Sequence, residues 1–171
     1  MPLLPSRVSH LIIDDMADSQ DLVLCDISGQ RRLSIAIGTH EALAIQRALN
    51  GEHFPRPLTH DLCAGLIMRL GFTADAVHIT DCDQGTFHAQ VIMVPTAAAA
   101  SSEPRSIDAR PSDAIAIALR CPGCSLMVND ELYASYNDPQ LDDSDELDDD
   151  ADDEAYVDDD EPDDSDDDGF P

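Results

Sequence analysis

Two short segments of the sequence place an arginine, a proline, a hydroxyl side chain and an aspartate at the predicted start of a helix. The first is Arg56-Pro57-Leu58-Thr59-His60-Asp61 and the second is Arg110-Pro111-Ser112-Asp113. A helix N-terminus presents free backbone N–H groups and a partial positive charge. An arginine beside it makes such an end suited to bind a phosphate or a carboxylate. The candidate substrate-binding residues are therefore Arg56, Thr59, Arg110 and Ser112.

The aspartates of these segments oppose a simple anion site, because Asp61 and Asp113 would repel a bound anion. They are suited instead to hold a divalent cation that bridges to a phosphate, or to act as acid–base groups. A structural alternative stays open at both positions. An aspartate in the first turn complements the helix dipole, and a serine or threonine there caps the helix end.

Four segments of the chain, in order, resemble motifs of the bifunctional nuclease domain of bacteria and plants. They are Ile37-Gly-Thr-His-Glu-Ala42, Arg56-Pro-Leu-Thr-His-Asp-Leu62, Gly85-Thr-Phe-His-Ala89 and Ile107-Asp-Ala-Arg-Pro-Ser-Asp-Ala-Ile-Ala-Ile-Ala-Leu-Arg120. The resemblance runs from about Val8 to Tyr133. It implies a compact domain that forms a homo-oligomer and acts on both DNA and RNA.

Matched position by position, the polar members of these motifs are Glu41, Arg56, Thr59, His60, Asp61, Asp108, Arg110, Ser112 and Asp113. Their types suit phosphodiester hydrolysis. The carboxylates of Glu41, Asp61 and Asp113 could bind Mg²⁺ or Mn²⁺, which lowers the pKa of a bound water. His60 could act as general base or acid, since histidine exchanges its proton near neutral pH. The two arginines of the helix starts would clamp the phosphate. In the alternative, His60 merely bonds a neighbouring carboxylate.

The elements that must position these residues follow from the period of the apolar residues along the chain. Period-two runs predict strands, and apolar residues three and four apart predict helices. A helix over 111–119 that is apolar on every side should be buried. The predicted strands are 8–13, 22–27, 33–37, 76–81, 86–94, 106–110 and 126–128, and the predicted helices are 40–49, 59–70 and 111–119, with a last helical turn at 130–133. Thr39 and Thr59 are the predicted caps of the first two helices. This order predicts an α+β domain with a mixed sheet and helices packed on one side.

Charge divides the chain into a domain over 1–137 and an acidic tail over 138–171. The 171 residues carry nine arginines, no lysine and 36 acids, for a net charge of −27. The tail holds 20 of those acids and no cation, which leaves 1–137 near −7. The tail is predicted to be disordered. It could be a solubilising appendage, a mimic of nucleic acid that inhibits its own domain, or a binder of basic partners.

Composition also excludes some classes of protein and indicates a compartment. No apolar run is long enough to span a bilayer, and the polybasic surface of a typical sequence-independent nucleic-acid binder is missing. Five cysteines without an export signal indicate reduced thiols and a cytoplasmic protein. The pair in Cys121-Pro-Gly-Cys124 is interpreted as a turn with two incidental thiols, because it follows the C-terminal end of a helix, which disfavours a thiolate.

Two functions from different classes remain. The first is a nuclease of low sequence specificity that hydrolyses phosphodiester bonds in DNA or RNA. The second is a non-catalytic, regulatory module that uses the same helix starts to bind an anion. A shared pocket for His60, Asp61, Arg110 and Asp113 would favour the enzyme, and their dispersal over separate faces would favour the module.

Overall fold

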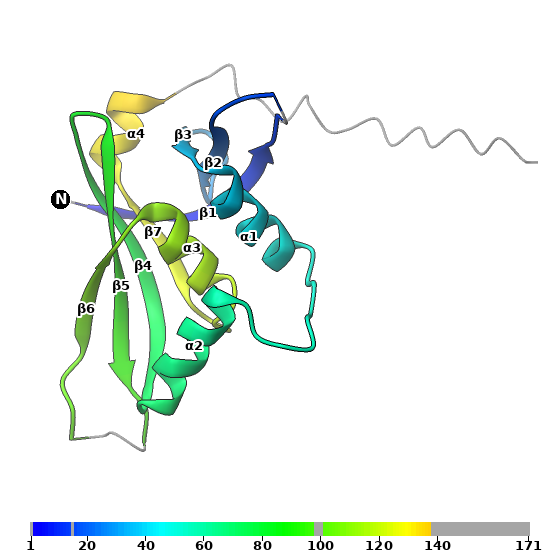
Figure 1. Cartoon of the computed structure of the whole chain (residues 1–171). Coiled ribbons are helices and arrows are strands. Elements are labelled where there is room, and N and C mark those ends of the chain that lie inside the picture. Colours follow the sequence, from blue (N-terminus) through cyan, green and yellow to red (C-terminus); the bar gives the residue numbers. More distant parts are fainter. Residues whose placement is uncertain (1, 15, 98–100, 138–171) are drawn as a thin grey trace, which may run out of the picture.

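Strands and helices alternate in the order that the sequence predicts, in a computed structural model that describes residues 2–14, 16–97 and 101–137 (Figure 1). The strands are β1 (Leu3–Ile12), β2 (Gln20–Asp26), β3 (Arg32–Ile37), β4 (Phe72–Asp83), β5 (Thr86–Pro95), β6 (Arg105–Ala109) and β7 (Ser125–Asn129). The helices are α1 (Thr39–Leu49), α2 (Thr59–Arg69), α3 (Pro111–Ala118) and α4 (Asp130–Tyr136).

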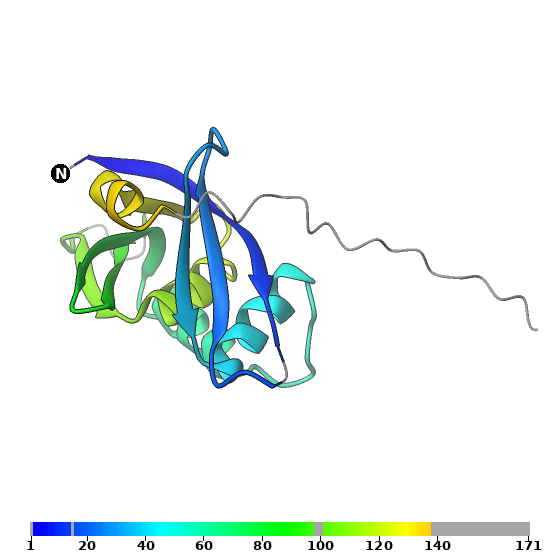
Figure 2. The ribbon, with the colours of Figure 1, turned by 90° about the horizontal axis from the view of Figure 1, so that it is seen from above.

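The strands form one curled sheet in the order β3-β2-β1-β7-β4-β5-β6 (Figure 2). The pair β4–β7 is parallel and the other neighbouring pairs are antiparallel. The sheet is therefore mixed, and the predicted α+β class is confirmed. The acidic tail and its predicted disorder lie outside the described residues, as do residues 98–100 in the alanine-rich segment before β6.

Two tight turns join the antiparallel pairs β2–β3 and β4–β5. Gly29, with φ +72°, lies in the turn between β2 and β3. Gln84 and Gly85, with φ +49° and +83°, join β4 to β5. Positive φ at both central residues is the geometry that matches the twist of paired strands, and glycine adopts it without steric cost. The second turn brings the tip of the β4–β5 hairpin towards the start of α3.

Helix α3 lies at the centre of the helical layer, between α1 and α2 and against β4 and β5 (Figure 1). Ala114, Ile115 and Ala116 are buried, which confirms the burial predicted for this helix. Burying a side chain such as Ile115 contributes roughly 1.5–3 kcal/mol. Helix α4 instead packs against β3 and β7, and the buried Tyr133 hydroxyl donates to Ser6 Oγ at 2.9 Å. The packing of α3 against α1, α2 and the sheet therefore sets the relative positions of the first turns of these three helices.

Element boundaries differ from the predictions where the local pattern is broken. β1 begins at Leu3, whereas the predicted strand begins at Val8. The first half of β1 was missed because proline is rare inside strands, and Pro5 lies in this half. The strand forms there nevertheless, because β1 pairs with both β2 and β7. β4 begins at Phe72, and irregular pairing near Ala74 and Ala76 interrupts its alternation. The predicted caps are wrong by one residue, because Gly38 and Leu58 occupy the capping positions and Thr39 and Thr59 are the first residues of α1 and α2.

The described helices include none long and apolar enough to cross a membrane.

Candidate active site

The first turns of α1, α2 and α3 meet around one cavity of about 600 Å³. In each helix the third residue is acidic: Glu41 in α1, Asp61 in α2 and Asp113 in α3. Helix starts leave their first backbone N–H groups without a partner inside the helix, and they carry partial positive charge. The core therefore brings three weakly positive helix ends together, each with a carboxylate in its first turn.

A contact between residues 53 positions apart joins the starts of α2 and α3. His60 Nε2 lies 3.2 Å from Asp113 Oδ1, and the two side chains are 16% and 31% exposed. Arg110 Nε donates to the other oxygen of Asp113 at 2.7 Å. Burial raises the pKa of Asp113, but the hydrogen bonds from Arg110 and His60 outweigh it, and the pKa lies below its ordinary value. Asp113 is therefore ionised at neutral pH.

The ionised state of Asp113 decides which nitrogen of His60 carries the proton. A carboxylate can only accept hydrogen bonds, so His60 Nε2 must be the donor. In the neutral imidazole the lone pair then resides on Nδ1, which makes no hydrogen bond to any residue that the structure describes. Asp113 thus fixes the orientation and the tautomer of His60, as a carboxylate does for a histidine in hydrolases.

Glu41 extends the same network from α1. Its Oε1 accepts from Arg110 Nη2 at 2.8 Å, so Arg110 bridges the acids of α1 and α3. These two carboxylates raise the pKa of Arg110, and the hydrogen bond that Arg110 donates to Asp113 is the largest cause. Gly38 precedes α1, and a Cβ atom at this position would collide with the Glu41 carboxylate. A glycine here leaves room for Glu41 to reach Arg110.

Asp61 is held by a different arginine, which the sequence did not suggest. Arg120 Nε donates to Asp61 Oδ1 at 2.5 Å, and its Nη atoms donate to the carbonyl oxygens of Ala116 and Ala44 at 2.8 and 3.1 Å. Asp61 also accepts from the N–H of Leu58 at 2.8 Å. Burial raises the pKa of Asp61, but the hydrogen bonds from Leu58 and Arg120 lower it by more, so the pKa lies below its ordinary value. Arg120 thereby ties α1, α2 and α3 together.

Arginine side chains are concentrated around this cavity, although the chain as a whole is strongly negative. Three of the nine arginines line it, together with two histidines and two acids. The lining residues with ionisable side chains are His40, Glu41, Arg47, His60, Arg110, Asp113 and Arg120. Arg110 remains 65% exposed despite its two partners, and its Nη1 makes no hydrogen bond to a described residue. A phosphate that enters this cavity meets arginine side chains and helix ends.

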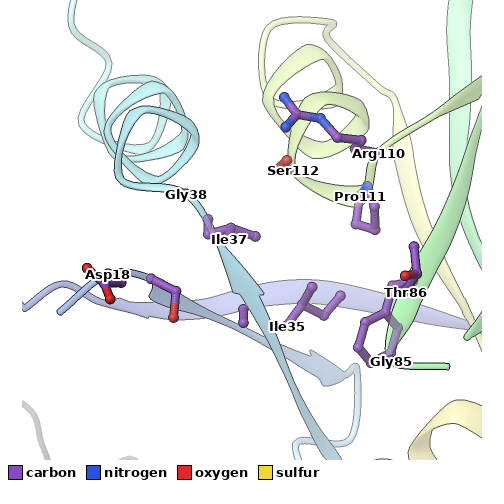
Figure 3. Close-up of a pocket in the computed structure, with 12 residues that line it drawn as sticks. Asp18, Ile35, Ile37, Gly38, Gly85, Thr86, Arg110, Pro111 and Ser112 are labelled. Carbon is purple, nitrogen blue, oxygen red and sulfur yellow. The ribbon is translucent and has the colours of Figure 1, made fainter.

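The structure brings some of the candidate residues together and separates others. Thr59 lines the cavity beside His60. Arg56 is exposed and is not among the lining residues, although the sequence suggested that it would face Arg110. Ser112 lines a second cavity, which Arg110 also lines (Figure 3). Asp61 reaches the site only through Arg120.

Arg47, in the last turn of α1, and Arg120, just after the end of α3, were missed because an arginine near the C-terminal end of a helix ordinarily complements the helix dipole. The residue type alone reveals no further role. A signal for Arg120 did exist. It ends the fourteen-residue segment from Ile107 that carries the family resemblance.

The three acids of the helix starts, Glu41, Asp61 and Asp113, do not lie together as a ligand set for a divalent metal. Among the described residues, no group of three or more His, Cys, Asp or Glu side chains is arranged to hold one. Asp61 and Asp113, predicted to bind Mg²⁺ or Mn²⁺, each contact an arginine instead, and a guanidinium beside a carboxylate repels a second cation. This arrangement does not fit a shared metal ion, and we derive no step through one.

The five cysteines are free thiols. Burial, followed by the neighbouring Cys121 and Asp75, raises the pKa of Cys124 to about 11. A thiol with such a pKa is a poor nucleophile at neutral pH. This favours the interpretation of the Cys121–Cys124 segment as a turn.

The sequence of this domain is similar to sequences of known proteins over most of its length. A protein of Mycobacterium tuberculosis (strain H37Rv) named as uncharacterised is 37% identical over 140 residues, which cover 82% of this chain and 80% of that protein. Bifunctional nuclease 1 of Oryza sativa subsp. indica is 27% identical over 116 residues, which cover 68% of this chain but 32% of the rice protein. The sequence model of the bifunctional nuclease domain matches residues 22–139, including all three helix starts. The chain therefore belongs to the bifunctional nuclease domain family.

Proposed function

We propose that this protein is a nuclease of low sequence specificity that hydrolyses phosphodiester bonds in DNA or RNA, and that the cavity between α1, α2 and α3 is its active site. The observation that carries the proposal is the Asp113–His60 pair, beside the exposed Arg110 in an arginine-lined cavity. The proposal is supported because His60, Asp113 and Arg110, which would act as the base, the group that orients it and the phosphate-binding cation, lie within one cavity. Family membership supports the same class of reaction.

The chemistry follows from the hydrogen bonds of this network. Nδ1 of His60 takes a proton from a water molecule as the water oxygen attacks phosphorus. The bond to the leaving sugar oxygen breaks, and solvent water returns a proton to that oxygen. The ionised Asp113 stabilises the imidazolium that forms. The products are a phosphate monoester and an alcohol, and no redox partner is needed.

Arg110 is the group best placed to bind the phosphate. Asp113 and Glu41 hold its Nε and Nη2 atoms, which leaves Nη1 to donate to a phosphate oxygen. Because its side chain is fixed from both sides, little conformational entropy is lost when substrate binds. Contacts to phosphate carry no sequence information, and this supports low sequence specificity.

We also propose that the protein forms a homo-oligomer. Leu62 and Leu66 on α2 are 52% and 49% exposed, Leu70 directly after α2 is 72% exposed, and Ile107 on β6 is 49% exposed. Apolar side chains grouped in this way commonly mark a surface between subunits. Light scattering coupled to size exclusion should give a mass above the 18.5 kDa of one chain. A monomer at all concentrations would contradict this proposal and leave the enzymatic one intact.

The experiment that tests the nuclease uses full-length protein from a nuclease-deficient host. Labelled single-stranded DNA, duplex DNA and RNA are incubated with wild type, with Asp113→Asn and with Asp75→Asn, an exposed acid outside the cavity. We expect cleavage by wild type and Asp75→Asn, and a loss of about 100-fold in Asp113→Asn. Parallel reactions with EDTA test the predicted metal. Tight binding without cleavage of any substrate would favour the anion-binding module instead.

A further inference from the structure

A second cavity, of about 410 Å³, shares Arg110 with the proposed active site (Figure 3). It lies between the end of β3, the tip of the β4–β5 hairpin and the start of α3, with Asp18 and Ser19 at its rim. Arg110 lines both cavities. A ligand group bound by Arg110 therefore lies next to both the proposed catalytic groups and this second cavity.

The lining of the second cavity differs in character from that of the first. Its walls include the apolar side chains of Ile35, Ile37, Phe87 and Pro111, and Arg110 is its one cationic lining residue among those the structure describes. Phe87 is held edge-to-face by Tyr136, with 5.3 Å between the ring centroids. A rigid apolar wall suits a flat, weakly polar group, and it does not suit a second phosphate.

The hydroxyl of Ser112 opens into this cavity. Ser112 is 4% exposed as a residue, lines the cavity and makes no hydrogen bond to any described residue (Figure 3). Because no fully buried side-chain oxygen or nitrogen of the described residues lacks a partner, this hydroxyl is accessible from the cavity. A ligand in the cavity can therefore replace water as its partner. A serine hydroxyl both donates and accepts, so it can pair with a polar edge of any nucleobase.

Taking the proposed function as given, we infer that the second cavity binds the unpaired base of the nucleotide next to the phosphate held by Arg110. The volume lies within the range of small-ligand sites, about 300–1,000 Å³. A base inside a duplex is stacked and paired, and extruding it costs free energy. The substrate class is therefore single-stranded nucleic acid, of DNA or RNA, with little preference among bases.

The test measures binding of full-length protein to three labelled probes at the same salt concentration. The probes are a ten-nucleotide DNA strand, the same strand with every base removed, and the corresponding duplex. The abasic strand has the same phosphates as the first, so the repulsion from the acidic tail cancels between them. We expect the strand with bases to bind at least about 10-fold more tightly than either of the others. Equal affinities for the strands with and without bases would overturn the inference.

The variant Ser112→Ala separates the hydroxyl from general effects. Because this hydroxyl has no partner in the protein, its removal should leave the midpoint of thermal unfolding unchanged. We expect about 5- to 10-fold weaker binding of the strand with bases and unchanged binding of the abasic strand. The exposed Ser106→Ala, on β6 outside both cavities, is the matched control. A Ser112→Ala variant that keeps the full base-dependent difference would contradict the role of this hydroxyl.

Cleavage of the same probes distinguishes the two proposals. A protein that cleaves duplex and single strand equally keeps the proposed function and overturns the second cavity as a base site. A protein that prefers strands with bases but cleaves none of the probes keeps the base site and overturns the proposed hydrolysis.

Discussion

Arg120, at the end of α3, is bound to Asp61, in the first turn of α2, with 2.5 Å between Nε and Oδ1. The arginine is 12% exposed and also bonds the carbonyl oxygens of Ala44 and Ala116. One side chain thus connects the three helices whose first turns form the proposed active site. Asp61, which the sequence suggested as a metal ligand, serves here to position Arg120 and the helices.

Removing Arg120 should therefore destabilise the domain. In Arg120→Met the Asp61 carboxylate loses its cation and two carbonyl groups lose a donor, so we expect the free energy of unfolding to fall by about 2 kcal/mol. Arg69→Met, an exposed arginine in the last turn of α2, removes the same charge and should change it by less than about 0.5 kcal/mol. Urea denaturation followed by circular dichroism measures both. Equal effects of the two variants would show that Arg120 contributes only its charge.

The stability that Asp61 provides should depend on pH in a defined direction. Its pKa in the folded state lies below the ordinary value of 3.8, so folding favours the ionised form. The contribution is therefore fully present above about pH 5 and is lost as the pH falls through the folded-state pKa. We expect Asp61→Asn to be less stable than wild type by about 1 kcal/mol at pH 7 and at pH 5, and the difference to shrink near pH 3. A difference that stays constant down to pH 3 would contradict this assignment.

A methyl group at position 38 should disturb the site without unfolding the protein. In Gly38→Ala the new Cβ meets the carboxylate of Glu41, which is the mobile end of a side chain and can move away. Glu41 then loses its contact with Arg110. We expect little change in the thermal midpoint, but a rate of cleavage reduced about as much as in Glu41→Gln. A Gly38→Ala variant as active as wild type would show that the Glu41–Arg110 contact is dispensable.

Truncation tests the prediction that the acidic tail weakens the binding of nucleic acid to the proposed active site. The variant 1–137 carries about −7 instead of −27, so it should bind a labelled single strand more tightly at low salt. The gain should shrink as salt rises, because the Debye length falls from ~10 Å at 0.1 M to ~3 Å at 1 M. Full-length protein and the variant are compared in a salt titration. Equal affinities at low salt would leave the tail as a solvated appendage.

Much of the fold could be predicted because its elements are locally consistent. The buried α3 and the Gln84-Gly85 turn each follow from a few neighbouring residues, as does the change of period at Thr39. The start of β1 could not be predicted, because a proline such as Pro5 argues against a strand in the sequence. The strand forms there because it pairs with β2 and β7, which are distant along the chain.

The site could be predicted in part for a similar reason. The types of His60, Arg110 and Asp113 are informative, and the core places them together. The roles of Arg120 and Ser112 could not be predicted from their types. In the sequence, Arg120 resembles an arginine that complements a helix C-terminus, and Ser112 resembles an ordinary serine in a first helical turn. Their partners, or the lack of one, are set by tertiary packing. Arg56 shows the converse, since the same local motif that places Arg110 at the cavity leaves Arg56 exposed outside it.

The most direct measurement is the single-turnover cleavage rate of His60→Gln against wild type, at saturating full-length protein on a labelled single strand. Glutamine can still bond Asp113 but cannot accept the proton of the attacking water. We expect the rate to fall at least about 100-fold while the affinity for the strand changes by less than about 3-fold, and imidazole added to the buffer to restore part of the rate. His53→Gln, an exposed histidine outside the cavity, should cleave like wild type. A His60→Gln variant that cleaves at the wild-type rate would contradict the assignment of His60 as the base.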